Sequence, residues 1–448
     1  MHTRQTRLRH AVLAGLSAWA LQSAAFEPAR AQAPAPVPLP TPVQRATPAA
    51  GLTIGPVLPP TRIPVPPRTA CKNTGSFEAW LAAFKQEASA KGIAPATLLA
   101  AAPTMTFDPG IVSRDRHQGF FAQSFQDFSA KLATSGRVSS SQNQIRKNAS
   151  TFARADQQWG VPAAVITAFW ALESDFGSGM GKLPVLRSLT TLAYDCRRGD
   201  MFRAELLDAL RIIDRGDLVP SEMIGSWAGE LGQTQFLPSH YYRHAVDYDG
   251  DGRRNLMRSP PDIIASTSAF ITSLGWQKGQ PWLEEVRLPA TMAWEQADLQ
   301  TQHPRSHWAK AGITKANGQP LTADSQRASL LLLMGRHGPA FLAYPNFRIF
   351  TEWNQSLNYA TTAAYLATRI SGAPPMSRGT GVVTPLTFEQ IRELQMLLDR
   401  RWRLGAFYVS SYAAIGVFWI VYWQLLLTWY GIASEAASAA GISYFIAR

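Results

Sequence analysis

An uninterrupted apolar segment near the middle of the chain constrains the fold most. Over residues 161–172 every side chain except that of Thr167 is apolar. A helix of this composition has no polar face, so other elements must surround it on most sides. Pro162 stands near the first turn, and the pattern predicts a helix over residues 162–173. The chain therefore needs a core large enough to bury a whole helix.

An acidic residue, Glu173, ends this apolar run. Desolvation by Phe169, Trp170 and Phe176 and the negative end of the helix dipole both raise the pKa of a carboxyl group placed there. A carboxyl group that stays protonated near neutral pH can act as a general acid. The segment alone does not decide this, because an acidic residue can equally mark the point where a helix reaches solvent.

Helical patterns dominate the rest of the central region. Apolar spacing and stop signals predict helices over residues 76–92, 142–160, 200–215, 262–275 and 356–370, and short strands over 328–333 and 347–351. There is no βαβ alternation and no internal repeat. The sequence predicts a mainly α fold of α+β type, in which a helical domain carries a small β element.

A second segment, SWAGELGQTQFLPS over residues 226–239, combines closely placed glycines with amide side chains and aromatic rings. Glycines let the backbone approach a ligand, and amides such as those of Gln233 and Gln235 hydrogen-bond hydroxyl and acetamido groups. The flat face of an aromatic ring such as Phe236 suits the apolar face of a sugar. This composition is typical of a carbohydrate site.

The segments ESDFG (173–177) and GELGQTQFLPS (229–239) together resemble the membrane-bound lytic transglycosylase B family of bacterial murein enzymes. Further matching pieces are DRHQ (115–118), GVP (160–162), MGK (180–182), VDYDGDG (246–252) and NQS (354–356). The resemblance covers residues 76–370. It implies that residues 71–370 form a catalytic domain with a lysozyme-like core.

The resemblance also implies a reaction. Members of the family break the β-1,4 bond between N-acetylmuramic acid and N-acetylglucosamine and leave a 1,6-anhydro ring. Glu173 would act first as acid and then as base, and the muramoyl 6-hydroxyl would be the nucleophile. No cofactor and no second catalytic carboxylate are then required, whereas an ordinary glycosidase pairs two carboxyl groups about 5–10 Å apart. Asp175, two residues further on, is expected to face elsewhere and to be structural.

Ser226, Gln235 and Asn354 match polar residues of the family's sugar cleft. The chain departs from the family at two nearby positions. The tyrosine that precedes the asparagine in relatives is Trp353 here, and the alanine or serine that follows Gly229 is Glu230. These changes affect the sugar subsites rather than the reaction. Two other functions stay open on the same fold, a lysozyme-type hydrolase and a non-catalytic wall-binding protein.

The loop DYDGDGR over residues 247–253 has carboxylates at alternate positions and glycines at the turn, as calcium loops do. The bidentate glutamate expected twelve residues into such a loop is Arg258 here. Some relatives bind calcium at this place and close the shell with a later aspartate, to which Asp262 corresponds. The candidate ligands of a structural Ca²⁺ are Asp247, Asp249, Asp251 and Asp262. The alternative is an Asx-rich turn held by its own hydrogen bonds.

The N-terminal residues have the pattern of an export signal. Basic residues precede an apolar stretch over residues 11–25, and small residues follow at Ala29, Ala31 and Ala33. This order predicts a signal peptide over residues 1–33 and a periplasmic protein. Residues 34–70 are rich in proline and predict an extended linker.

Cys71 and Cys196 are the only cysteines. In an exported protein such a pair predicts one disulfide, with two separate buried thiols as the alternative.

The C-terminal part changes composition twice. Residues 371–385 predict a linker, and residues 386–403 resemble the opening helix of a small peptidoglycan-binding domain that does not continue. Residues 404–448 form an apolar tail, with no charged residue over 404–434. By length and apolarity residues 404–434 could span a bilayer. The arginines just before them oppose the positive-inside tendency, so a disrupted wall-binding module is an equal alternative.

The charge balance fits an anionic polymer as partner, since the formal net charge is +12. No nucleic-acid motif is present, so no nucleic-acid partner is expected. The expected partner is the glycan strand of peptidoglycan, with membrane contact through residues 404–434 if that segment spans the bilayer.

Overall fold

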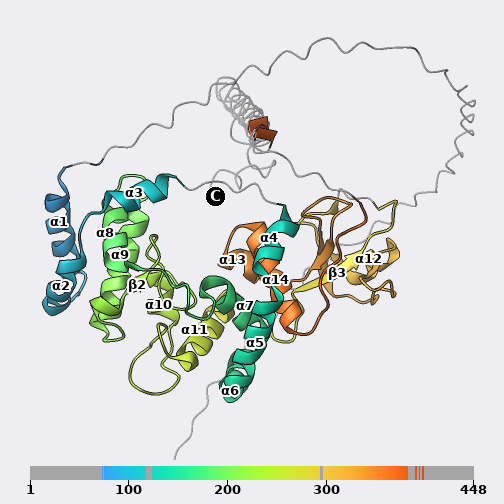
Figure 1. Ribbon diagram of the computed structural model, residues 1–448, viewed down its shortest axis with the longest axis horizontal. Coiled ribbons are helices and arrows are strands. Elements are labelled where there is room, and N and C mark those ends of the chain that lie inside the picture. The colour runs from blue at the N-terminus through green and yellow to red at the C-terminus, as the bar shows by residue number, and fades with distance from the viewer. Residues whose placement is uncertain are drawn as a thin grey trace, which may run out of the picture. The chain divides into compact units, whose positions relative to one another are not determined.

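Fourteen helices and seven short strands make up the part of the chain that the computed structural model describes (Figure 1). The described residues are 73, 75–117, 124–292, 296–381 and five residues between 389 and 397. The helices are α1 Phe77–Ala90, α2 Pro95–Ala101, α3 Pro109–Arg116, α4 Phe125–Leu132, α5 Ser135–Lys147, α6 Ala149–Trp159, α7 Ala163–Ser174, α8 Val185–Tyr194, α9 Gly199–Asp214, α10 Pro238–His244, α11 Pro260–Ser273, α12 Arg305–Lys310, α13 Phe347–Trp353 and α14 Leu357–Ile370. The strands are β1 Leu183–Pro184, β2 Ile224–Gly225, β3 Leu283–Arg287, β4 His303–Pro304, β5 Thr314–Lys315, β6 Arg327–Leu331 and β7 Ala340–Ala343.

The apolar helix α7 is buried as the sequence predicts. All residues from Ala164 to Ala171 are buried, and α5, α11 and α14 contact the helix. Its neighbours α14 and α11 are themselves rich in buried small and apolar residues, which lets the backbones come close. One large hydrophobic core therefore runs through the helical part and contains α7 at its centre.

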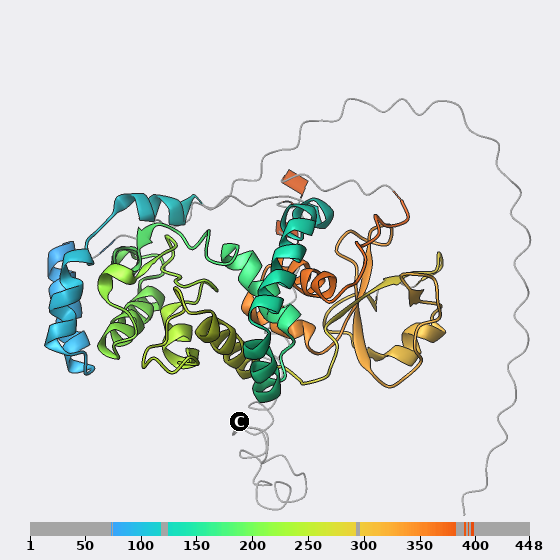
Figure 2. The ribbon, with the colours of Figure 1, turned by 60° about the horizontal axis from the view of Figure 1, so that its bottom comes forward.

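The β element is an antiparallel sheet with strand order β4-β6-β7-β3-β5 (Figure 2). Its central register pairs Leu283 of β3 with Ala343 of β7, and the same alanine with Ser329 of β6. One face of the sheet, together with α12, encloses a second, smaller core around Trp308, Val286 and Leu330. The helix α14 contacts β3 and so joins the sheet to the helical part.

Most of the predicted helices are present, with two corrections. The single helix predicted over residues 142–160 is two helices, α5 and α6, which meet at Asn148. That residue leaves helical geometry, and its side-chain amide donates to the carbonyl of Gln144. The strand predicted over residues 347–351 is wrong, because this segment is helix α13. Its large apolar residues Phe347, Phe350 and Trp353 recur every third position, a helical spacing that a five-residue window does not reveal.

Several predicted features fall wholly or partly outside the described residues. These include the signal peptide (1–33), the whole proline-rich linker (34–70), Cys71 and the tail (404–448). Within the described part, no helix is long and apolar enough to cross a membrane. Residues 371–381 of the predicted linker are described and tied to the domain. The backbone N–H of Thr380 donates to the carbonyl of His337 at 2.8 Å, and that of Met376 donates to the hydroxyl of Tyr365 at 3.0 Å.

Candidate active site

The carboxyl group of Glu173 lies in the last turn of α7 and is half-buried. Its Oε1 accepts hydrogen bonds from Nε1 of Trp353 at 2.7 Å and from the hydroxyl of Tyr359 at 2.5 Å. The other oxygen, Oε2, has no hydrogen-bond partner within the described residues and is not closed off from solvent. One oxygen is therefore fixed by the protein, and the other is free for a ligand.

The indole of Trp353 is itself fixed by aromatic packing. The ring of Trp353 stacks on Phe169, one turn before Glu173, with centroids 4.1 Å apart. Phe270 and Phe236 contact the same indole from other sides, with centroids 5.3 and 5.7 Å away. Since Trp353 is held on several sides, its N–H keeps a constant direction toward the carboxyl group.

Burial raises the pKa of Glu173 to about 7. Removal from water is the largest cause, since it disfavours the charged form. The hydrogen bonds from Tyr359 and Trp353 oppose it because they stabilise the carboxylate, and the negative charge of Glu230 adds to the rise. The group can therefore both give and take a proton near neutral pH. Tyr359 has its own pKa raised well above 10 by burial and by Glu173, so it remains a neutral donor.

The segment 226–239 is fastened to the end of α7 through the residue after the acid. The hydroxyl of Ser174 donates to the carbonyl of Gln233 at 2.5 Å and accepts from the N–H of Gly177 at 2.9 Å. Gly177 has φ +95°, and a side chain there would collide with that of Gln233. The two motifs that are separate in the sequence therefore form one rigid unit.

Two residues that the sequence offers as sugar contacts serve the fold instead. The amide of Gln233 accepts from Nε1 of Trp170 at 2.8 Å and donates to the carbonyl of Met257 at 3.0 Å. Phe236, predicted as a substrate-binding residue, is 2% exposed and lies among Phe270 and Trp353. It cannot offer a ring face to a sugar, and its role is to support Trp353.

The other three predicted sugar contacts are half-buried. The amide nitrogen of Gln235 donates to the carbonyls of Gly232 and Met180, at 2.8 and 3.2 Å, which leaves its oxygen for a ligand. Asn354 follows Trp353 directly, and its side-chain oxygen accepts from the N–H of Ser356 at 2.9 Å. Ser226 lies in the same segment as Gln235, and its hydroxyl is bound to Glu230 at 3.0 Å.

Asp175 is structural, as predicted. It caps α7 in the left-handed conformation, with φ 47°. Its two oxygens accept from the guanidinium of Arg137 on α5, at 2.6 and 2.8 Å. This ion pair lowers the pKa of Asp175. The residue therefore closes the end of α7 against α5 and is not a partner acid of Glu173.

Sequence reasoning missed three residues of the site. The first is Trp353, which the sequence shows only as a departure from relatives although its indole donates to Glu173. Tyr359 lies in the first turn of α14, and nothing in its local sequence distinguishes it from a core tyrosine. Glu230 is noticed in the sequence only as a departure from relatives, yet its charge reaches both Glu173 and Tyr359. Tyr359 and Glu230 come together with Glu173 only through the packing of α7 against α14 and the 226–239 segment.

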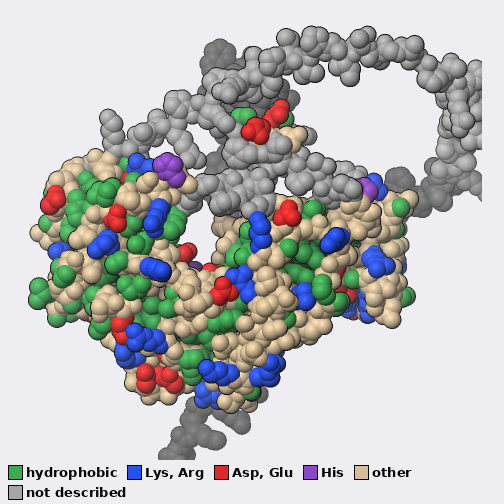
Figure 3. All heavy atoms as spheres, viewed as in Figure 1, with side chains coloured by type: hydrophobic (Ala, Val, Ile, Leu, Met, Phe, Trp, Pro, Cys, Tyr) green, Lys and Arg blue, Asp and Glu red, His purple; other side chains and the backbone are tan. Residues whose placement is uncertain are grey.

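The surface over these elements is hollowed. Figure 3 shows a depression between the part that contains α8 and α9 and the part that contains α4 and α13, with acidic side chains at its border. In the same view α7 lies toward the base of this depression (Figure 1).

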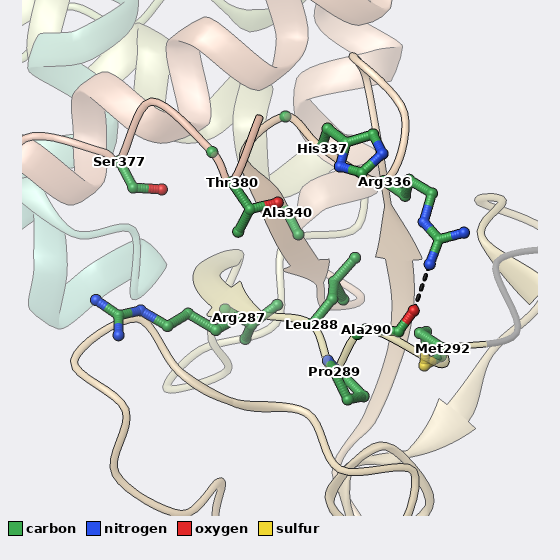
Figure 4. Close-up of a pocket in the computed structure, with 13 residues that line it drawn as sticks. Arg287, Leu288, Pro289, Ala290, Met292, Arg336, His337, Ala340, Ser377 and Thr380 are labelled. Carbon is green, nitrogen blue, oxygen red and sulfur yellow. Dashed lines mark hydrogen bonds between the residues drawn. The ribbon is translucent and has the colours of Figure 1, made fainter. Parts of the chain in front are cut away.

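A separate cavity of about 450 Å³ lies in the β element and contains none of these residues. The end of β3, the β6–β7 turn and residues 377–380 line it (Figure 4). Arg336 at its edge donates to the carbonyl of Ala290. This cavity has no acidic lining residue, so we assign it no part in the site of Glu173.

The acidic loop brings three of the four predicted metal ligands together. One carboxylate oxygen each of Asp247, Asp249 and Asp251 lies within 4.8 Å of the others. The fourth, Asp262, does not join them. It is fully buried, and its two oxygens accept from the backbone N–H groups of Tyr248 and Asn255, both at 2.7 Å.

Comparison with known proteins identifies the family of the chain. The family model of the transglycosylase SLT domain matches residues 76–368, which include every residue of the site described above. The chain belongs to this family. It is 37% identical over 214 residues to membrane-bound lytic murein transglycosylase B of Escherichia coli K12, covering 46% of this chain and 56% of that protein. The chain thus spans little more than half the length of this curated relative.

Solved structures of the family have the same fold. SltB3 from Pseudomonas aeruginosa, in complex with NAG-anhNAM-pentapeptide, is 40% identical with a TM-score of 0.69, over 73% of this chain and 88% of that one. The Escherichia coli lytic transglycosylase Slt35, in complex with calcium, is 29% identical with a TM-score of 0.51, over 59% and 83%. The predicted class, a mainly α, lysozyme-like fold with a small β element, is confirmed.

The link between α7 and the 226–239 segment can be tested by Ser174→Ala. We expect a loss of roughly 1–3 kcal/mol in the free energy of unfolding, because the half-buried carbonyl of Gln233 and the half-buried N–H of Gly177 lose their partner. Urea denaturation measures this loss. Ser139→Ala is the matched control, since Ser139 is exposed on α5 and its replacement should change stability by less than about 0.5 kcal/mol. Equal losses in the two variants would contradict the assigned role of Ser174.

Proposed function

We propose that this chain is a lytic transglycosylase that cleaves the β-1,4 bond between N-acetylmuramic acid and N-acetylglucosamine in peptidoglycan and forms 1,6-anhydromuramic acid. The observation that carries the proposal is the Glu173 carboxyl group, which has a pKa near 7, one oxygen fixed by two donors, and another oxygen that has no partner among the described residues and is not closed off from solvent. The similarity to named lytic transglycosylases supports the same reaction.

In the proposed mechanism Glu173 acts twice. Its Oε2–H protonates the glycosidic oxygen as the bond from that oxygen to the muramoyl C1 breaks, and the N-acetylglucosamine part leaves with a 4-hydroxyl. The resulting carboxylate then takes the proton of the muramoyl 6-hydroxyl, whose oxygen bonds to C1. The acid is regenerated and no water is consumed. Because the substrate supplies the nucleophile, the ion-paired Asp175 is not needed in the reaction.

The partners and the location follow from this activity. We propose glycan strands of peptidoglycan as the substrate, bound through Gln235, Asn354 and the neighbourhood of Ser226, and the periplasm as the compartment. The side chain of Asn73 accepts from the N–H of Cys196 at 2.9 Å. Because Asn73 is two residues from Cys71 in the sequence, this contact supports the predicted Cys71–Cys196 disulfide.

Product analysis distinguishes the proposed reaction from the two alternatives. Digestion of purified peptidoglycan should release anhydro-muropeptides, and mass spectrometry identifies them. Reducing-end muropeptides would instead indicate a lysozyme-type hydrolase, and sedimentation with sacculi without any product would indicate a wall-binding protein. Glu173→Gln should lower the rate by at least about 10²-fold, since it removes the only proposed acid. Anhydro products at the parent rate from this variant would overturn the mechanism.

The two donors to Glu173 predict a pH effect. The proposed acid must be protonated, so the rate should fall as the pH rises through about 7. Trp353→Phe keeps an aromatic ring at this position but removes the hydrogen bond to the Glu173 carboxylate, which is worth about 1.5–3 kcal/mol. The pKa of Glu173 should then rise by about 1–2 units, and the alkaline limb of the pH–rate profile should move upward with it.

Trp282→Phe is the control for this experiment. The same change is made there at an indole whose N–H donates to the carbonyl of Ala364, at 3.0 Å. It should leave the alkaline limb in place. An unchanged or lowered limb in Trp353→Phe would contradict the role given to this hydrogen bond.

We further propose that Asp247, Asp249 and Asp251 hold a structural Ca²⁺. Asp262 would support the loop through its hydrogen bonds from the backbone N–H groups of Tyr248 and Asn255. Their three clustered carboxylates match the hard oxygen donors that calcium prefers. Ca²⁺ should therefore raise the unfolding temperature in a thermal-shift assay, whereas Mg²⁺, which needs a tighter octahedral shell, should not. Asp249→Asn should abolish the shift. Asp262→Asn should destabilise the domain with or without the ion, and no Ca²⁺ effect on the parent would favour the hydrogen-bonded turn.

A further inference from the structure

The hydroxyl of Ser226 has no bonding capacity left for a ligand. It donates to Oε2 of Glu230 at 3.0 Å and accepts from the N–H groups of Ala228 and Glu230 at 3.1 and 3.2 Å. A hydroxyl has one proton and two lone pairs, and all three are used here. Ser226 can contact a sugar only if it first releases Glu230.

The Glu230 carboxylate, by contrast, has one oxygen free. Oε2 is bound to Ser226, whereas Oε1 has no partner among the described residues and is not sealed from solvent. The backbone of Glu230 is also fixed, because its carbonyl accepts from the N–H of Ser226 at 2.9 Å. A rigid, half-buried carboxylate with an open oxygen is arranged to accept a hydrogen bond from outside the protein.

Glu230 lies close to the site of Glu173. The hydrogen bond from Ser174 to Gln233 fastens the segment that carries Glu230 to the end of α7. The charge of Glu230 acts on both Glu173 and Tyr359. Arg137, whose charge acts on Tyr359, is paired with Asp175. Among the described residues, Glu230 is the charged group that acts on the pKa of Glu173.

The ligand that suits Oε1 of Glu230 is a neutral hydrogen-bond donor. A carboxylate only accepts hydrogen bonds, and it repels anions. An acetamido N–H or a hydroxyl of a sugar ring meets both requirements. We propose that Glu230 is a substrate-positioning residue, which holds Ser226 through Oε2 and receives a sugar N–H or O–H of the bound glycan at Oε1. This inference rests on the proposed function and adds a second acidic residue to the substrate site.

Glu230→Gln tests the inference with little change of shape. The glutamine oxygen can still accept from Ser226, but its NH₂ group then faces the sugar donor. We expect soluble glycan-strand fragments to bind about tenfold more weakly, measured by calorimetry in the inactive Glu173→Gln background. The unfolding temperature should stay the same. Glu78→Gln, a change at an exposed carboxylate on α1, is the control and should bind like the parent.

Glu230→Ala distinguishes the loss of a substrate contact at Glu230 from a general disturbance of the site. It removes the carboxylate but releases the Ser226 hydroxyl, so binding should weaken less than in Glu230→Gln. Adding Ser226→Ala to Glu230→Ala should remove this compensation. In the otherwise wild-type enzyme Glu230→Gln should also move the alkaline limb of the pH–rate profile to lower pH, because a repulsive charge near Glu173 is lost.

Dissociation constants within twofold of the parent for both Glu230 variants would overturn the inference. So would unchanged binding combined with a new ratio of reducing-end to anhydro products, which would indicate that Glu230 acts on water. These outcomes differ from a failure of the proposed function. In that case the wild-type chain would release no anhydro-muropeptides at all, whatever residue stands at position 230.

Discussion

The position of the Glu173 carboxyl group, between a buried helix and an open hollow, is the constraint on which the rest of the structure depends. Burial alone would raise the pKa further, so that the group would stay protonated but be a weak proton donor. The N–H of Trp353 and the hydroxyl of Tyr359 offset this by stabilising the carboxylate. The opposing effects leave a pKa of about 7, where a proton can move in both directions. The balance requires that two donors, 180 and 186 residues from Glu173 in the sequence, meet one oxygen.

That requirement explains why the core and the site share residues. Phe169 is buried in α7 and is also the ring on which Trp353 stacks. Ser174 ends the same helix and fastens it to the segment that carries Glu230. A change that loosens the core around α7 would therefore also move the donors of Glu173. In this domain stability and the acidity of one side chain are determined by the same contacts.

Periodicity made much of this predictable from the sequence. The helices α7, α9, α11 and α14 have long, regular apolar patterns, and Glu173 and Asp175 take their places from the end of α7. A sequence pattern does not show in which direction a side chain points. An amide and an aromatic ring in a glycine-rich segment suggest sugar binding, but Gln233 and Phe236 turn inward. Tyr359 could not be identified at all, since it is 186 residues from the acid that it contacts.

Glu230 shows how a change of one residue can alter a site without altering its fold. A second carboxylate beside a catalytic acid is usually associated with hydrolysis, because it can activate water or attack the sugar. Here one of its oxygens is engaged by Ser226, and burial raises the pKa of Glu230, so it is less readily ionised than a free carboxylate. Its remaining negative charge favours the protonated form of Glu173, the form that begins the reaction. The same carboxylate that occupies the Ser226 hydroxyl thus also helps to keep the proton on Glu173.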